Sequence, residues 1–371
     1  WAEYVRSDDD HEGHRSDRIY TLVDEADGRT VTRTALAIGV GDSYIDEDNR
    51  LYEVVRIDGS TAYVKFVEQV SLPEISAQPS RRSGGGMASW LRAGAFRRPW
   101  LAQGNAPAGD RARDGGGGAG GGRSRDSVAI YHSHNAESYV PTSGTEFEEG
   151  RGDVHGVGAA LKEALEEQGV EVHWSQRLPL PHDGGAYRRS RATVRELLQK
   201  QPVTMLDVHR DAIPAEEYIT TVNGEEMTKV RLVVGRQNQN REANLEYAKR
   251  IKAIADQEFP GLIKGIFNAR GNYNQDVGPR MMLLEFGTHE TSLEHARRAA
   301  RLMAQVIPRA AGIEGGRDTV GASGWRTALW LLVLAVVGVL AYVRINAGSW
   351  EAFFQRLQEW GARLRGLMGQ K

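Results

Sequence analysis

Three short segments place histidine and carboxylate side chains at spacings that suit a metal-dependent hydrolase. The first contains His134-x-x-Glu137, the second ends near His209, and the third carries Glu285. A catalytic zinc ion typically takes three protein ligands and leaves one position for water. We therefore predict that Zn²⁺ is held by His134, Glu137 and His209. Glu285 is then the natural base, which takes a proton from the water as it attacks an amide carbonyl.

Other polar residues near these segments are predicted to support the site or to contact a substrate. His132 precedes the first pair by two residues, and we interpret it as a packed strand histidine or as a residue that supports the ligands. The predicted substrate contacts lie beside the ligands or in and after the loop that precedes the third segment: Asn135, Arg210, Asp211, Asn274, Gln275 and Arg280.

Each of the three segments follows a short apolar run that is typical of a buried strand. Stretches typical of amphipathic helices alternate with these runs, at 157–168, 192–201, 240–259 and 292–307. The alternation predicts an α/β catalytic domain over residues 127–311, with a largely parallel sheet flanked by helices. Because the carboxyl ends of parallel strands meet at one edge of a sheet, the three segments are expected to converge there.

Changes of composition divide the rest of the chain. Short alternating runs separated by turn residues predict a small antiparallel β module at the N-terminal end. Residues 328–343 are uncharged, and a helix around them would be ~30 Å long, enough to cross a bilayer core. The predicted order is 1–17 disordered, 18–70 β module, 71–126 Gly/Arg-rich linker, 127–311 catalytic domain, 312–324 linker, 325–345 transmembrane helix and 346–371 amphipathic cytoplasmic tail. This order predicts a single-pass protein of the cell membrane, with the catalytic domain outside the cytoplasm.

The composition excludes several classes of protein. The 371 residues include no cysteine, so a metal must be bound by His, Asp or Glu, and disulfides and cysteine nucleophiles are excluded. The net charge of −2 gives no electrostatic case for nucleic-acid binding. The length allows two or three domains of ordinary size.

Four stretches together resemble the stage II sporulation protein P family. They are 131–139 (Tyr-His-Ser-His-Asn-Ala-Glu-Ser-Tyr), 207–211 (Asp-Val-His-Arg-Asp), 273–276 (Tyr-Asn-Gln-Asp) and 284–289 (Leu-Glu-Phe-Gly-Thr-His). The resemblance covers about residues 127–307. It implies a fold similar to that of the zinc N-acetylmuramoyl-L-alanine amidases.

The same resemblance implies roles for individual residues. The two histidine ligands and the catalytic glutamate of those amidases would match His134, His209 and Glu285. Their glutamate ligand comes from the start of the first helix, where this chain has Arg-Gly-Asp-Val-His at 151–155. Glu137 takes that place in our prediction, and the alternatives to it are Asp153 and His155.

The resemblance also implies a biological setting. It implies cleavage of the amide that joins muramic acid to the stem peptide of peptidoglycan, and also of peptide cross-links. It further implies work beside a glycan-cleaving partner and a membrane scaffold protein during engulfment of the forespore. Members of the family carry an N-terminal membrane anchor, whereas the anchor predicted here is C-terminal.

Two other functions fit parts of the pattern. A zinc carboxypeptidase also combines His-x-x-Glu, a later histidine and a catalytic glutamate. In that case Arg210 or Arg280 would have to bind the terminal carboxylate of the substrate. A non-catalytic wall-binding scaffold would use the β module and the long linker as a tether. The masses of products from cross-linked sacculi separate the two enzymes, and substitution of Glu285 separates an enzyme from a scaffold.

Overall fold

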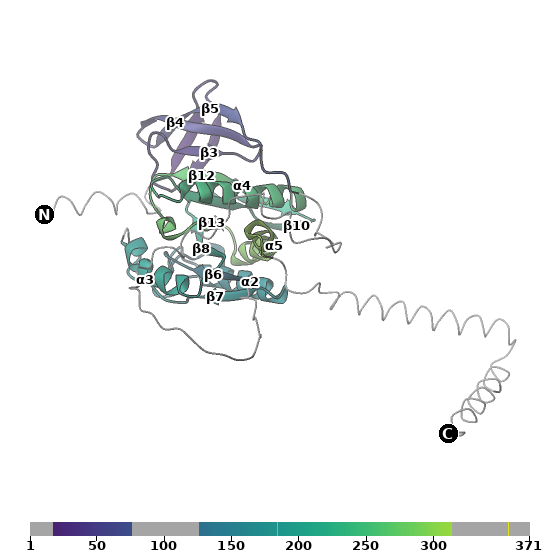
Figure 1. Ribbon diagram of the computed structural model, residues 1–371. Helices are drawn as coiled ribbons and strands as arrows, with labels where there is room; N and C mark the ends of the chain where they lie inside the picture. The colour runs from purple at the N-terminus through teal and green to yellow at the C-terminus, as the bar shows by residue number, and fades with distance from the viewer. Residues whose placement is uncertain (1–17, 76–125, 184, 314–354, 356–371) are drawn as a thin grey trace, which may run out of the picture. The chain divides into compact units, whose positions relative to one another are not determined.

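Strands and helices alternate along residues 126–313. The computed structural model describes residues 18–75, 126–183, 185–313 and 355, and contacts divide the chain into two units, Trp1–Gly316 and Arg317–Lys371. All elements named here belong to the first unit. In this segment they are β6 (Ser127–Tyr131), α1 (Val140–Ser143), α2 (Val154–Glu167), β7 (Glu171–Trp174), α3 (Ala186–Leu198), β8 (Thr204–Asp211), β9 (Ile219–Val222), β10 (Glu225–Thr228), β11 (Val230–Gly235), α4 (Arg241–Glu258), β12 (Ile263–Ala269), β13 (Met281–Thr288) and α5 (Leu293–Ala311) (Figure 1).

The strands form a mixed sheet within an α/β fold. β7, β6, β8 and β13 lie side by side in that order and run parallel. β11 pairs antiparallel with β13 and parallel with β12. The sequence predicts a largely parallel sheet, and the difference begins at β11. A hairpin of β9 and β10, and no long helix, connects β8 to β11. The chain therefore returns to the sheet at the edge where β8 ends, and β11 runs in the opposite direction to β8 and β13.

Helices cover both faces of this sheet, and each face has its own core. α2, α4 and α5 pack on one face, where their buried side chains include Leu161, Ile251 and Met303 (Figure 1). α3 packs on the opposite face, where Val194 contacts a cluster that includes Met205. Full burial of an aliphatic side chain contributes about 1.5–3 kcal/mol, so these contacts fix the strands that carry the three chemical segments.

The N-terminal strands continue the same sheet. They are β1 (Tyr20–Asp24), β2 (Thr30–Thr34), β3 (Ser43–Ile45), β4 (Arg50–Asp58) and β5 (Thr61–Gln69). The sequence predicts a module of its own over 18–70, but β3 pairs antiparallel with β12, and the two parts share one 11-stranded sheet. Pairing across so long a connection leaves no trace in local sequence patterns.

The N-terminal part of the sheet curls back over the face that carries α3. Its aromatic side chains Tyr44 and Tyr52 belong to one core cluster with Phe267 of β12 and Leu283 of β13. Register shifts in the β4–β5 pair accompany this bend. As a result, β2 lies against the face of β11 although five strands separate the two in the sheet order.

Among the described residues, no helix combines the length and the apolar character needed to cross a membrane. The predicted transmembrane helix at 325–345 lies outside the described residues. The same holds for residues 1–17 and for almost all of the predicted linkers and C-terminal tail.

Candidate metal site

His134, Glu137 and His209 form one compact group at the carboxyl edge of β6 and β8. The His134 Nδ1 atom lies 3.3 Å from Glu137 Oε1, and His209 Nδ1 lies 3.5 Å from the same oxygen. One ligand atom from each residue lies within 4.8 Å of the others, and all three side chains are buried. Ligands at ~2.0–2.2 Å from a tetrahedral ion are about 3.3–3.5 Å apart, so this donor set fits zinc. The group contains the three ligands that the sequence predicts.

The local sequence explains why His209 presents Nδ1 to this group. Asp207 and His209 are two residues apart in a strand, so both side chains lie on one face of β8. The Asp207 Oδ1 atom lies 2.9 Å from His209 Nε2. Ser133 fixes Asp207 in turn, because its backbone N–H donates to Oδ1 (2.9 Å) and its hydroxyl donates to Oδ2 (2.6 Å). A carboxylate behind a ligating imidazole sets the tautomer and orients the ring.

The electrostatics of the two histidines differ. Burial lowers the pKa of His134 to about 3, so its imidazole is neutral and has a lone pair to offer. Burial also acts against the charged form of His209, but Asp207 and Glu137 outweigh it and raise the pKa to about 10. The carboxylates thus make the position between the rings favourable for a cation. A metal ion bound there would replace the proton of His209.

Replacing Asp207 with asparagine is expected to weaken zinc binding about 10–100-fold, because an amide no longer fixes the tautomer and orientation of His209. Competition with a chelator of known affinity measures the change. The control is Asp58→Asn, at the end of β4, where the carboxylate is exposed. Equal zinc affinity in the two variants would show that Asp207 does not support the ligand.

Glu285 lies on the strand next to the metal group. It pairs with His209 across β13 and β8, and with Arg231 across β13 and β11. The side chain is fully buried. The Tyr218 hydroxyl donates to Glu285 Oε2 (3.0 Å), and Arg231 Nη1 lies 3.8 Å from the same oxygen. Burial raises the pKa of Tyr218 well above its usual value, so this hydroxyl keeps its proton and donates.

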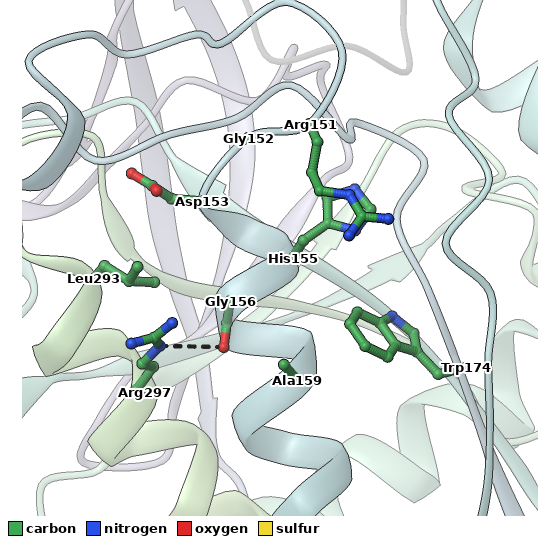
Figure 2. Close-up of a pocket in the computed structure, with 9 residues that line it drawn as sticks. All are labelled: Arg151, Gly152, Asp153, His155, Gly156, Ala159, Trp174, Leu293 and Arg297. Carbon is green, nitrogen blue, oxygen red and sulfur yellow. Dashed lines mark hydrogen bonds between the residues drawn. The ribbon is translucent and has the colours of Figure 1, made fainter.

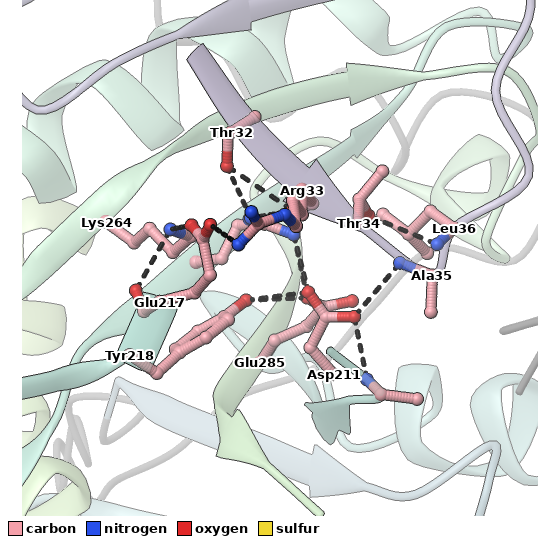
Figure 3. Close-up of polar contacts among 12 residues, drawn as sticks. Thr32, Arg33, Thr34, Ala35, Leu36, Asp211, Glu217, Tyr218, Lys264 and Glu285 are labelled. Carbon is pink, nitrogen blue, oxygen red and sulfur yellow. Dashed lines mark hydrogen bonds and ion pairs between the residues drawn. The ribbon is translucent and has the colours of Figure 1, made fainter. Parts of the chain in front are cut away.

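Asp211 and the N-terminal strand complete the surroundings of Glu285 (Figure 3). Asp211 Oδ2 accepts from Arg231 (2.6 Å) and lies 3.1 Å from the Tyr218 oxygen, whose one hydrogen is shared between Asp211 and Glu285. From the N-terminal side, Arg231 donates to the Thr32 hydroxyl (3.0 Å) and to the carbonyl of residue 33 (2.7 Å). The backbone N–H of Ala35 donates to Asp211 (3.3 Å). Residues 32–35 therefore belong to the polar network that holds the glutamate.

Arg210, Asp211 and Arg280, which were predicted as substrate contacts, lie at different distances from the metal group. Arg210 is fully buried and donates to the backbone carbonyls of Ser138 and Glu146. Asp211 is also fully buried, and its carboxylate is held by the network described above. Arg280 precedes β13, roughly five residues and ~16 Å from Glu285 along an extended strand. These contacts give the three residues structural roles around the strands.

The other predicted residues also have hydrogen bonds within the fold. The His132 ring is packed inside the fold. Its Nδ1 lies 3.0 Å from the carbonyl of Val208, and Trp174 Nε1 donates to its Nε2 (3.2 Å). Asn135 donates to the carbonyl of Gly150, and Asn274 donates to that of Tyr187 (3.1 Å). The Gln275 amide bonds the backbone of β11 through Gly235 and Val233. All four side chains are buried.

The two alternatives to Glu137 lie outside the metal group. Asp153 accepts from the backbone N–H of Tyr139 (3.1 Å) and from the Ser143 hydroxyl (2.5 Å). The His155 ring packs on His132, with 4.3 Å between the ring centroids. Among the described residues, Glu137 is the carboxylate that joins the two histidines in a group able to hold a metal.

An aromatic layer over the metal group is absent from the sequence-based prediction. The Tyr187 ring lies 4.9 Å from that of His134 and stacks on His209 at 6.1 Å with an interplanar angle of 10°. His182 lies 4.7 Å from His134, and Phe147 lies 4.6 Å from His182. These side chains come from loops and from the first turn of α3. Their contacts depend on the folding of separate loops, and we find no sequence signal for them.

The fold and the buried histidine–glutamate group define an α/β protein with a candidate divalent-metal site. A profile of stage II sporulation protein P (SpoIIP) matches residues 102–308, more than half of the chain. This chain therefore belongs to the stage II sporulation protein P family. It is 33% identical over 199 residues to stage II sporulation protein P of Bacillus subtilis (strain 168), a match that covers 48% of this chain and 50% of that protein. The chain thus spans about half the length of this curated relative.

Two solved amidase structures overlap with the chain at low similarity. The N-acetylmuramyl-L-alanine amidase Ami1 from Mycobacterium smegmatis is 16% identical with a TM-score of 0.37, covering 51% of this chain and 98% of that chain. The CwlD amidase from Clostridioides difficile, in complex with the GerS lipoprotein, is 11% identical with a TM-score of 0.37, covering 51% and 100%. Similarities of this size assign no function.

Proposed function

We propose that this protein is a zinc-dependent peptidoglycan hydrolase that cleaves the amide between N-acetylmuramic acid and L-alanine during sporulation. The observation that carries the proposal is the buried group of His134, Glu137 and His209, with Glu285 beside it on the neighbouring strand. Membership of the stage II sporulation protein P family supports the sporulation setting and a wall substrate.

Each of these residues has its own role in the hydrolysis of an amide. His134, Glu137 and His209 would hold zinc, which polarises the amide carbonyl and lowers the pKa of a water molecule toward ~7. Glu285 takes a proton from the attacking water and delivers it to the leaving amine. Tyr218 and Arg231 hold the Glu285 carboxylate in place, as Asp207 holds the ring of His209.

The alternative functions have less support. A zinc carboxypeptidase needs an arginine for the terminal carboxylate, but Arg210 is buried with its guanidinium bound to backbone carbonyls, and Arg280 precedes the strand at the end away from Glu285. A non-catalytic scaffold has no need for a buried glutamate on the strand beside the metal group. Burying a carboxylate costs several kcal/mol unless it is paired, and here a buried arginine and tyrosine accompany it.

The wider setting belongs to the same proposal. The helix predicted at 325–345 tethers the protein to the cell membrane, with the hydrolase outside the cytoplasm. Peptide cross-links are a second class of substrate, and a glycan-cleaving sporulation enzyme and a membrane scaffold protein are the partners. The motifs that resemble the family, at 131–139, 207–211, 273–276 and 284–289, support the substrate and the partners, and the uncharged run at 328–343 supports the tether.

The experiment that tests the proposed function is digestion of intact sacculi by the purified full chain, with products identified by mass. Release of whole stem peptides with a free amino-terminal alanine is the expected result. Release of single terminal residues would instead indicate the carboxypeptidase. Sacculi that stay intact, with zinc supplied and with a glycan-cleaving enzyme added, would overturn the proposal.

A further inference from the structure

An open cavity, lined by both polar and apolar groups, lies at the same edge of the sheet as the metal site. Its volume is about 370 Å³, and it opens between the first turns of α2 and α5 and the end of β7 (Figure 2). α2 follows β6, α5 follows β13, and Trp174 is the last residue of β7. The cavity is thus at the carboxyl edge of the parallel strands, where ligands of α/β sheets bind.

Two arginines give this cavity a positive charge. Arg151 and Arg297 stand on opposite sides of it (Figure 2). Arg151 donates to the Gln176 side chain (2.5 Å) and Arg297 to the carbonyl of Gly156 (3.4 Å), and both acceptors are neutral. Neither guanidinium forms an ion pair with a carboxylate of the described residues. The acidic residue in the lining, Asp153, accepts from Tyr139 and Ser143, at the two ends of α1.

The cavity also contains a buried histidine with unused hydrogen-bonding atoms. His155 is 4% exposed, and within the described part of the chain neither ring nitrogen has a hydrogen-bond partner. Burial, together with His132 and Arg151, lowers the pKa of His155 to about 3, so the ring is neutral and offers one donor and one acceptor. A buried polar group left unbonded costs about 1–3 kcal/mol, and a ligand in the cavity would recover that energy.

These groups define the chemistry of a ligand. Two guanidinium groups and an imidazole N–H are donors for a carboxylate, and charge-assisted bonds of this type are the stronger ones. The indole of Trp174 offers an apolar wall, and the floor at Gly156 and Ala159 has no large side chain. The site suits a carboxylate carried on a short aliphatic or peptide framework.

We propose that this cavity binds a free carboxylate of the stem peptide while the adjoining amide occupies the metal site; this inference rests on the proposed function. In the wall polymer the lactyl carboxyl of muramic acid is consumed in the scissile amide, and the N-acetylated sugars are neutral. Free carboxylates therefore lie on the peptide side of that bond. A cationic cavity beside the metal group accordingly receives the peptide.

The backbone connects the cavity directly to the metal ligands. The N–H of Gly152, in the cavity wall, donates to the carbonyl of Asn135 (2.8 Å), and the N–H of Val154 donates to that of Glu137 (3.1 Å). The His155 ring packs on His132, two residues before the ligand His134. The cavity wall is therefore bonded directly to the loop that carries His134 and Glu137.

The test compares two synthetic substrates on the full chain. One is a muramoyl tripeptide with free carboxylates, and the other is the same compound with every carboxylate amidated. The wild-type chain is expected to prefer the free acid at least 10-fold in kcat/KM. The double variant Arg151→Gln/Arg297→Gln is expected to lose about 10–100-fold on the free acid, mainly through KM, so that the preference falls toward one. Arg298→Gln is the matched control, since Arg298 lies next to Arg297 on α5 and contacts Glu226 and Glu294 outside the cavity.

Binding of the free tripeptide, measured by calorimetry, separates the two hypotheses. Tripeptide binding that the double variant loses supports the cavity even if neither substrate is cleaved, an outcome that would count against the proposed function alone. Cleavage of both substrates at equal rates, with tripeptide binding equal in the wild-type chain and the double variant, would overturn the inference and leave the proposed function intact.

Discussion

Replacing Glu285 with glutamine is expected to lower the rate of amide cleavage about 10²–10⁴-fold, the usual contribution of a positioned general base. Glutamine keeps the shape of the side chain and can accept from Tyr218, but it cannot take a proton from water. Zinc content should stay close to that of the wild-type chain, because the ligands are His134, Glu137 and His209. The measurement is the initial rate of stem-peptide release, with zinc determined on the same sample.

The control for this variant is Glu294→Gln, an exposed glutamate in the first turn of α5. It should release stem peptides at the wild-type rate. Unreduced activity in Glu285→Gln would show that another group takes the proton. It would also leave the buried carboxylate of Glu285 with a structural role only.

Replacing Arg231 with methionine is expected to be the most destabilising single change around the site, at about 3–5 kcal/mol, because it leaves buried carboxylates without their cation. Arg231 is fully buried and contacts both Asp211 (2.6 Å) and Glu285 (3.8 Å). It also bonds Thr32, so the change should loosen the N-terminal strand from the site. Urea unfolding measures the loss of free energy.

A second substitution identifies the cause of this loss. Adding Asp211→Asn to Arg231→Met removes one uncompensated carboxylate, so the double variant should be more stable than the single one. The control is Arg50→Met, whose partly exposed ion pairs with Asp46 and Asp48 are worth about 1 kcal/mol or less. If Arg231→Met cost no more than Arg50→Met, the buried network would not hold the site together.

Much of the fold between residues 127 and 311 could be predicted because its elements carry local signals. The apolar runs at β6, β8 and β13 and the helical periodicities of α2, α4 and α5 are each contained in one short stretch. β12 has a weaker signal, since Lys264 and Gly265 interrupt its apolar residues. Gly265 is required there: its φ is +152°, and a Cβ would lie 2.5 Å from the carbonyl oxygen of Ile45. That reason is visible only once β3 and β12 are paired.

The candidate site also has a part that local sequence signals predict and a part that they do not. The metal group could be predicted because its residues follow three apolar strands, and strand ends of a parallel sheet converge without further information. Arg231 and Tyr218 were missed because their role depends on β11 entering the sheet beside β13. A signal was present for Arg231, which is the one charged residue in the apolar run of β11, Val-Arg-Leu-Val-Val-Gly. A charge at such a position needs a buried partner.

The N-terminal strands were the least predictable part of the site. β2 spans Thr30–Thr34, and the residues directly after it form a loop. It is this strand and loop that reach Arg231 and Asp211. Their contact depends on the curl of an 11-stranded sheet, which no single stretch of sequence encodes.

Metal content and hydrolytic activity, measured together on the purified full chain, test the central claim most directly. The chain as isolated is expected to contain about one zinc ion, to lose stem-peptide release when a chelator removes that ion, and to regain it when zinc is returned. His209→Asn should contain little zinc and stay inactive under the same treatment. Undiminished release of stem peptides from a chain freed of metal would contradict the account.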